Sequence, residues 1–132
     1  KPKLLGVDYL QLLEASGRAE NRVQAVSQIS RGLKNLAVRL QIPVIVLSQL
    51  NRDSKRAGRE PELHDLRESG SIEQDSNTVI FLHCKPDQES LPFANIEVIV
   101  RKNRSGRKGR VTMTFEKPYQ RFTEAGGAHA FE

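Results

Sequence analysis

The spacing of apolar residues predicts a strand, a long helix and a second strand in the first fifty positions. Residues 4–7 form a short apolar run that ends at Asp8, the pattern of a strand buried on both faces. From 22 to 41 the apolar positions recur in steps of three and four, which predicts an amphipathic helix of roughly five turns. Residues 44–50 make a second apolar run that turns polar at its end. This order indicates a parallel βαβ unit.

The second half of the chain predicts a third strand and a β-hairpin. The run TVIFLHC at 78–84 has the composition of another buried strand, and LHDL at 63–66 is typical of a helical turn. Stretches of alternating pattern follow at 95–102 and 110–115, and the segment NRSGRKG between them has the glycines of a hairpin turn. We therefore expect an α/β fold, a parallel sheet with flanking helices and a C-terminal antiparallel hairpin.

The polar stretch DLRESGSIEQDSNTV at 65–79 predicts an unusually long connection before the third strand. Gly70 allows a close approach of the backbone, and the neighbouring hydroxyl and amide groups can bind phosphates. The segment SIEQ also fits a capping box at the start of a helical turn, so a structural role is equally open. Residues 123–132 have little to pack and predict a disordered tail.

Composition excludes several classes of protein. No apolar run approaches the roughly 18 residues of a membrane-spanning helix, and the single cysteine excludes an internal disulfide and favours a cytoplasmic protein. The three histidines and one cysteine lack the spacing of a zinc site. A net charge of +5 favours polyanionic partners, and six of the ten residues at 101–110 are Lys or Arg. The charge is therefore concentrated at the tip of the predicted hairpin.

Polar residues are expected at the carboxyl ends of the strands, where open α/β sheets bind ligands. Asp8 follows the first strand, Ser48 and Gln49 follow the second, and His83 closes the third. An apolar strand that ends in Asp has the form of a Walker B motif, whose carboxylate holds Mg²⁺ through water, but a turn or cap Asp gives the same pattern. Gln49 can contact a γ-phosphate, or simply satisfy a backbone group at the strand end.

The basic tip has three readings on chemical grounds. Arginine is always charged and binds phosphate oxygens with two parallel hydrogen bonds, which suits a finger that reaches a nucleotide. The same cluster suits a nucleic-acid contact. It also suits a solvated tip whose charges prevent edge-to-edge pairing of an exposed hairpin.

Four stretches together resemble one protein family. GVDYLQLL, then NRVQAVSQISRGLKNLAVRLQIPVIVLSQLNR, then DLRESGSIEQDSNTVIFLHC, then IVRKNRSGRKGRVTMTF are similar to the C-terminal motor of the bacterial replicative DNA helicase, the DnaB family. The resemblance covers about residues 4–122, and we take residues 1–122 as the C-terminal portion of a RecA-like motor domain. Its most specific element is the block DLRESGSIEQD preceded by LSQLNR, a block that argues against recombinase-type relatives.

The resemblance implies a hexameric ring of RecA-like (P-loop NTPase type) domains that hydrolyses ATP with Mg²⁺ between subunits and moves along single-stranded DNA. Asp8 matches the Walker B aspartate that supports Mg²⁺, and Gln49 matches the glutamine that contacts the γ-phosphate. Lys102 and Arg104 match the basic finger that reaches the neighbouring subunit's nucleotide, with Arg104 as the arginine finger. Such a finger would stabilise negative charge on the transferred phosphoryl group.

The resemblance also implies a DNA-binding loop that contains Arg67, Glu68 and Gly70. Because this loop has no aromatic residue, we expect it to grip phosphates rather than stack on bases. A primase and a helicase loader are the partners expected for the family.

The sequence departs from the family pattern at the phosphate-binding loop. Nothing resembling GxxxxGK[ST] occurs in the 132 residues, and the glutamate that activates water in this family has no counterpart. We therefore expect this chain alone to hydrolyse essentially no ATP. The alternative is a nonenzymatic DNA-binding or ring-interaction module with the same fold.

Overall fold

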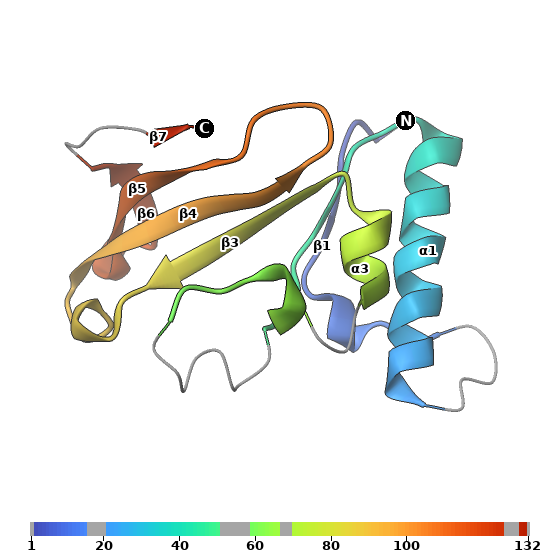
Figure 1. Cartoon of the computed structure of the whole chain (residues 1–132), viewed down its shortest axis with the longest axis horizontal. Coiled ribbons are helices and arrows are strands. Elements are labelled where there is room, and N and C mark those ends of the chain that lie inside the picture. Colours follow the sequence, from blue (N-terminus) through green and yellow to red (C-terminus); the bar gives the residue numbers. More distant parts are fainter. Residues whose placement is uncertain (1, 16–20, 51–58, 67–69, 126–129, 132) are drawn as a thin grey trace. The chain divides into compact units, whose positions relative to one another are not determined.

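The computed structural model describes residues 2–15, 21–50, 59–66, 70–125 and 130–131, and these form two compact units (Figure 1). Unit 1 comprises the described residues of Lys1–Asp53 and Leu63–Ser76. Unit 2 comprises those of Ser54–Glu62 and Asn77–Glu132. The predicted loop residues 51–58 lie outside the described part of the chain.

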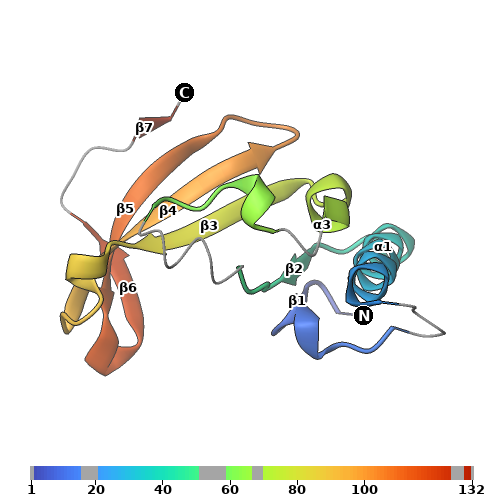
Figure 2. The ribbon, with the colours of Figure 1, turned by 60° about the horizontal axis from the view of Figure 1, so that its bottom comes forward.

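Unit 1 contains the predicted parallel βαβ element. Strands β1 (Leu5–Val7) and β2 (Val44–Val46) are parallel neighbours, with Val7 opposite Val46 (Figure 2). The backbone N–H of Leu47 donates to the carbonyl of Val7 at 2.9 Å, which extends the pairing by one bond. The strand predicted over 44–50 is shorter than expected, because the chain leaves strand geometry after Val46.

Helix α1 (Arg22–Leu40) connects the two strands, as the apolar spacing predicts. Asn21 caps its start, since its side-chain Oδ1 accepts a hydrogen bond from the backbone N–H of Gln24 at 2.9 Å. The helix ends at Gln41, whose backbone is left-handed with φ of 52°. A left-handed residue is a common helix stop, so the helix ends before Pro43 can interrupt it.

Gly32 lies in the middle of α1, and a Cβ atom at this position would meet nothing within 4 Å. Glycine in a helix interior is less favourable than alanine, because glycine loses more backbone freedom on folding. We therefore expect Gly32→Ala to raise the free energy of unfolding by about 0.5–1 kcal/mol. Urea denaturation of the two chains measures the difference, and an unchanged or lower midpoint would contradict it.

The long polar stretch at 65–79 is only partly a loop. A single 3₁₀ turn (Leu63–Asp65), predicted from LHDL, precedes it, and α3 (Gly70–Asp75) occupies its middle. Helices α1 and α3 lie side by side in both ribbon views (Figures 1 and 2), and the hydroxyl of buried Ser30 donates to Asp75 Oδ2 at 2.7 Å. This contact between distant residues fixes a helix that the local sequence leaves undecided.

The capping box, one of the two readings of the segment SIEQ, is not formed. Ser71 is the second residue of α3 rather than the residue before it, so its side chain is not in the capping position. Its Oγ is buried and has no hydrogen-bond partner in the described part of the chain.

Unit 2 is an antiparallel sheet in the order β3-β4-β5-β6, with β7 paired to β5 (Figure 1). The predicted hairpin is confirmed and is slightly longer than expected, because pairing extends to Phe93 opposite Glu116. The strands are β3 (Thr78–Cys84), β4 (Phe93–Asn103), β5 (Gly109–Glu116), β6 (Arg121–Glu124) and β7 (Ala130–Phe131). Three further 3₁₀ turns are Leu10–Leu12 in unit 1 and Pro86–Gln88 and Lys117–Tyr119 in unit 2.

Strand β3 has the predicted bounds but not the predicted burial. Val79 and Phe81 are buried, whereas Ile80 and Leu82 on the other face are 54% and 60% exposed. A continuous apolar run suggests burial on both faces, but β3 belongs to an antiparallel sheet, in which one face commonly stays uncovered. His83 is also not at a strand end, because it lies inside β3 opposite Glu97.

Residues 123–132 were predicted to be a disordered tail, but four of the described residues in this range belong to strands. Thr123 and Glu124 belong to β6, and Ala130 and Phe131 form β7. The boundary between the motor domain and a tail stays a prediction.

Candidate nucleotide site and basic hairpin

Asp8 and Gln49 lie at the same edge of the parallel β1–β2 pair. Asp8 directly follows β1 and Gln49 lies three residues beyond β2, at the carboxyl ends of the two strands. Both side chains are exposed. The register therefore places Asp8 and Gln49, which follow separate strands, at the same edge of the pair. This edge is where open α/β sheets bind ligands.

Gln11 connects these two strand ends, and the sequence analysis did not identify it. Its Nε2 donates to Ser48 Oγ at 3.0 Å and lies 3.5 Å from the carbonyl oxygen of Gln49. Its Oε1 accepts from the backbone N–H of Gln49 at 3.3 Å. The sequence could have indicated the contact between Gln11 and Gln49, because Gln11 follows Asp8 by three residues and so lies near the carboxyl ends of β1 and β2.

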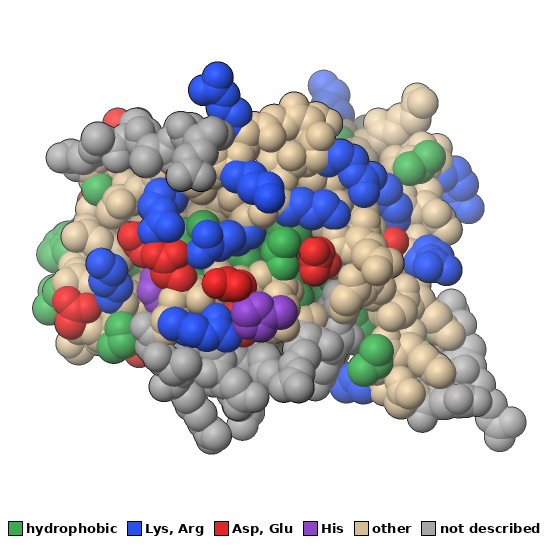
Figure 3. All heavy atoms as spheres, in the orientation of Figure 1, with side chains coloured by type: hydrophobic (Ala, Val, Ile, Leu, Met, Phe, Trp, Pro, Cys, Tyr) green, Lys and Arg blue, Asp and Glu red, His purple; other side chains and the backbone are tan. Residues whose placement is uncertain are grey.

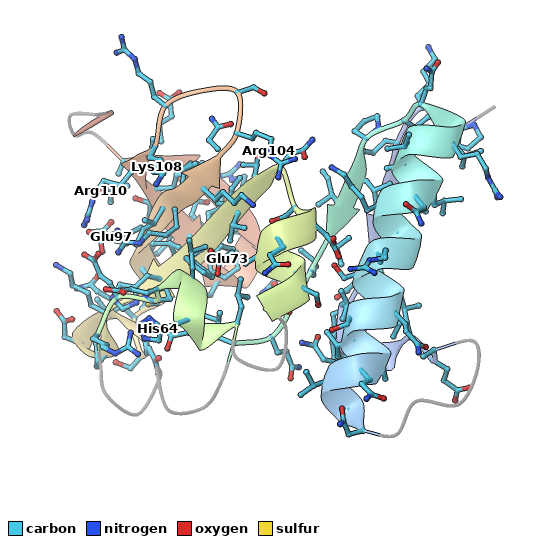
Figure 4. All side chains as sticks on the ribbon, turned by 45° about the vertical axis from the view of Figure 1, so that its right-hand side comes forward. His64, Glu73, Glu97, Arg104, Lys108 and Arg110 are labelled. Carbon is cyan, nitrogen blue, oxygen red and sulfur yellow. The ribbon has the colours of Figure 1, made fainter. Side chains whose placement is uncertain are left out.

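Lys102 and Arg104 lie at the far end of the β4–β5 hairpin in unit 2. Lys102 belongs to β4 opposite Val79 of β3, and Arg104 begins the turn, where its backbone N–H donates to the carbonyl of Asn77 at 2.9 Å. The Arg104 side chain is exposed and points away from the sheet at the end of the hairpin (Figure 4). The two cationic residues therefore have anchored backbones and lie two positions apart.

The turn itself has little room. Asn103 Nδ2 donates to the carbonyl of Arg107 at 3.1 Å and bridges the turn. A Cβ atom on Gly106 would lie 2.6 Å from this Nδ2, so a larger residue would push the bridge aside. Lysine and arginine side chains gather over this part of the surface, beside a group of acidic ones (Figure 3).

Two of the six Lys and Arg residues at 101–110 are paired with Glu60. This pairing was not predicted from the sequence. Arg101 Nη2 lies 2.8 Å from Glu60 Oε2, and Arg110 Nη1 lies 2.7 Å from Glu60 Oε1. Arg110 also lies 3.7 Å from Glu97 Oε1, and the Arg101 Nε donates to the carbonyl of Pro61. Figure 4 shows Arg110 next to Glu97 and away from Arg104. Arg101 and Arg110 therefore share one carboxylate, whereas Arg104 to Lys108 are exposed.

Glu60 should make stability depend on pH on the acid side. The hydrogen bonds from Arg110, more than the pairing with Arg101, hold the pKa of the Glu60 carboxyl below its ordinary value of 4.5, although burial opposes the shift. A lowered pKa means that the contribution is complete above pH 4.5 and is lost as the pH falls through the folded-state pKa.

The variant Glu60→Gln tests this dependence. We expect it to lower the melting temperature at pH 7, and the difference from the unchanged chain should shrink at pH values well below 4.5. Glu124→Gln, at an exposed position of β6, serves as the control and should have little effect at either pH. An equal loss at both pH values would show that Glu60 acts through packing rather than charge.

The predicted DNA-binding residues are only partly described. Arg67 and Glu68 lie outside the described residues. Gly70 is exposed as the first residue of α3, and a Cβ atom there would meet nothing within 4 Å. Packing among the described residues therefore does not require glycine at this position. Its proposed use, a close approach by a ligand, stays a prediction.

The donor set at Asp8 fits a magnesium ion that keeps most of its water. Over the described ranges, no group of three or more His, Cys, Asp or Glu side chains could enclose a metal ion. Magnesium is usually bound by one or two carboxylates together with water and nucleotide phosphates, so a single exposed carboxylate is compatible with it.

Among the described residues, no helix is long and apolar enough to cross a membrane.

Comparison with known proteins identifies the class and then the family. The fold resembles two solved structures, one of them an ATPase domain and the other "The Structure Of A DnaB-Like Replicative Helicase And Its Interactions With Primase". Each has a TM-score of 0.82 and 41% identity and covers 92% of this chain, and the match takes in 44% of the first structure and 30% of the second. The chain therefore has a RecA-like α/β fold of the kind found in these ATPase domains.

The family model described as "DnaB-like helicase C terminal domain" matches residues 1–124, and the chain belongs to this family. It is 48% identical over 120 residues to the replicative DNA helicase DnaC of Bacillus subtilis, covering 88% of this chain and 26% of that protein. The chain spans about a quarter of the length of the curated relatives it matches. The resemblance inferred from the sequence motifs is thus confirmed.

Proposed function

We propose that this chain is part of an ATP-dependent hexameric replicative helicase that moves along single-stranded DNA and unwinds the duplex. The observation that supports this best is the common edge of Asp8 and Gln49, because it gives a member of this family two of the groups that an ATP site needs. The 132 residues lack a phosphate-binding loop, so turnover is proposed for the full-length protein and not for this chain alone.

Within this site, Asp8 would hold Mg²⁺ through water, and the ion would neutralise charge on the β- and γ-phosphates of ATP. Gln49, at the end of the neighbouring strand, would donate its amide to the γ-phosphate or orient the attacking water. Both roles require a fixed distance between the strand ends. The parallel pairing, with the Leu47 N–H bonded to the Val7 carbonyl, favours such a distance.

Lys102 and Arg104 would act on the nucleotide of the neighbouring subunit. Their position at the end of a hairpin suits this role, because the β4–β5 strands carry the two cations to the tip of the sheet. Such a finger stabilises the transition state and contributes less to binding of the ground state.

The segment with Arg67, Glu68 and Gly70 would hold the phosphates of single-stranded DNA in the channel of the ring. Asp75 at the end of α3 accepts a hydrogen bond from Ser30 of α1, so movement of α1 would be transmitted to α3 and to this segment. ATP at one interface would thereby shift one DNA-binding loop relative to the next. A primase and a helicase loader are the further proposed partners, and the cytoplasm the proposed location.

The DNA-binding role predicts a change in the salt dependence of binding. In the full-length helicase, we expect Arg67→Ala to weaken binding to poly-dT and to mixed-sequence single strands by the same factor. The slope of log K against log salt should fall by about 0.7, the value for one phosphate contact on a single strand. Fluorescence anisotropy at several salt concentrations measures it. A loss confined to one sequence would indicate base recognition and contradict the proposal.

A further inference from the structure

Gln11 makes a two-sided contact with the residue that the proposed function places at the γ-phosphate. Its side-chain oxygen accepts from the backbone N–H of Gln49, while its side-chain nitrogen faces the carbonyl of the same residue. This arrangement copies the pairing of one peptide unit with another, and it fixes the orientation of the amide. A reversed amide would place oxygen against oxygen and nitrogen against N–H.

The contact continues through Ser48. The Ser48 hydroxyl accepts from Gln11 Nε2 at 3.0 Å and lies 3.4 Å from the Gln49 carbonyl, to which it donates. Gln11 therefore contacts both Ser48 and Gln49, which lie beyond the last backbone bond between the two strands. If Gln11 were replaced by an apolar residue, Ser48 and Gln49 would lose their side-chain hydrogen bonds to the segment that follows β1.

The position of Gln11 is itself well fixed. The preceding residue, Leu10, is 2% exposed, and its backbone N–H donates to the carbonyl of Leu47 at 2.8 Å. Arg22 at the start of α1 reaches the Gln11 carbonyl with its Nη2. The side-chain amide thus extends from a buried anchor three residues after Asp8. From this position Gln11 holds the backbone of Gln49.

We propose that Gln11 is a positioning residue that fixes Gln49 for catalysis. This inference rests on the proposed function of Gln49. Gln11 need not touch the nucleotide; it acts by holding the backbone of Gln49, so that the Gln49 side chain starts from one fixed point. Because the orientation of a catalytic group matters most in the transition state, losing this restraint should lower kcat more than it raises KM.

The test uses the full-length helicase with ATP and saturating single-stranded DNA. Gln11→Leu removes both hydrogen-bonding groups at similar volume, and we expect kcat to fall about tenfold with KM changed by less than about twofold. Gln11→Glu keeps an acceptor for the Gln49 N–H but places a carboxylate oxygen against the Gln49 carbonyl, so it should recover only a small part of the loss. Gln28→Leu, an exposed glutamine on α1, is the matched control and should leave kcat unchanged.

A double-mutant cycle separates this inference from the proposed function. If Gln11 acts through Gln49, then Gln11→Leu should cause no further loss of kcat in a Gln49→Ala background. A Gln11→Leu enzyme as active as the Gln28→Leu control, or losses that multiply in the double variant, would overturn the inference alone. Wild-type turnover by Gln49→Ala would instead overturn the proposed role of Gln49. If the Gln11→Leu protein fails to assemble, Ser48→Ala is tested in its place. We expect a smaller fall in kcat for Ser48→Ala. An unchanged kcat would overturn the inference.

Discussion

Arg104→Ala in the full-length helicase is expected to reduce ATP turnover by about 10³-fold or more while leaving ATP binding near normal. An arginine finger stabilises charge that develops on the transferred phosphoryl group, so its removal affects the transition state and not the bound ground state. Steady-state turnover and equilibrium binding of a fluorescent ATP analogue measure the two effects separately. Weakened binding with residual turnover would place Arg104 in the nucleotide-binding role of its own subunit.

Arg107→Ala is the matched control for this prediction. Arg107 is exposed in the same turn, carries the same charge and lies three residues further along the chain. A general loss of positive charge at the tip would affect both variants equally. The proposed finger predicts a large loss for Arg104→Ala and a small one for Arg107→Ala. Similar losses would favour a diffuse electrostatic role for the whole hairpin.

Asp8→Asn is expected to have the second largest effect, a loss of turnover of about 10²–10³-fold. Asparagine keeps the size and the strand-end position of Asp8 but removes the charge that would hold the hydration shell of Mg²⁺. The Mg²⁺ concentration that gives half-maximal turnover should therefore rise as well. Glu14→Gln, an exposed acidic residue a few positions further along the chain, is the control. If Asp8→Asn kept both turnover and Mg²⁺ dependence, Asp8 would be only a strand-end turn residue.

The periodic elements of this fold could be predicted from the sequence because their signals are local. The three- and four-residue spacing over α1, the apolar run before Asp8 and the alternation along β4 and β5 each depend on near neighbours only. The common edge of Asp8 and Gln49 also followed, since parallel strands place their carboxyl ends together. The resemblance to the family rested partly on motifs in these segments and most specifically on the block DLRESGSIEQD at 65–75.

The features that could not be predicted depend on contacts between distant residues. Helix α3 is short and polar, and the bond from Ser30 to Asp75 across 45 positions helps to hold it. The pairing of Glu60 with Arg110 spans 50 positions, so nothing in the local run of charges indicated it. The open face of β3 could not be predicted either, because a continuous apolar run looks the same whether one face or both are covered.

The central claim is that one subunit supplies Asp8 and its neighbour supplies Arg104 to a shared ATP site, and subunit mixing tests it most directly. Asp8→Asn and Arg104→Ala proteins, each nearly inactive, are mixed, allowed to exchange subunits, and assayed for ATP turnover. In a head-to-tail ring about a quarter of the interfaces would combine both intact residues, so turnover should rise well above that of either variant. Turnover that stays at the level of the separate variants would show that both residues act within one subunit and would contradict the account.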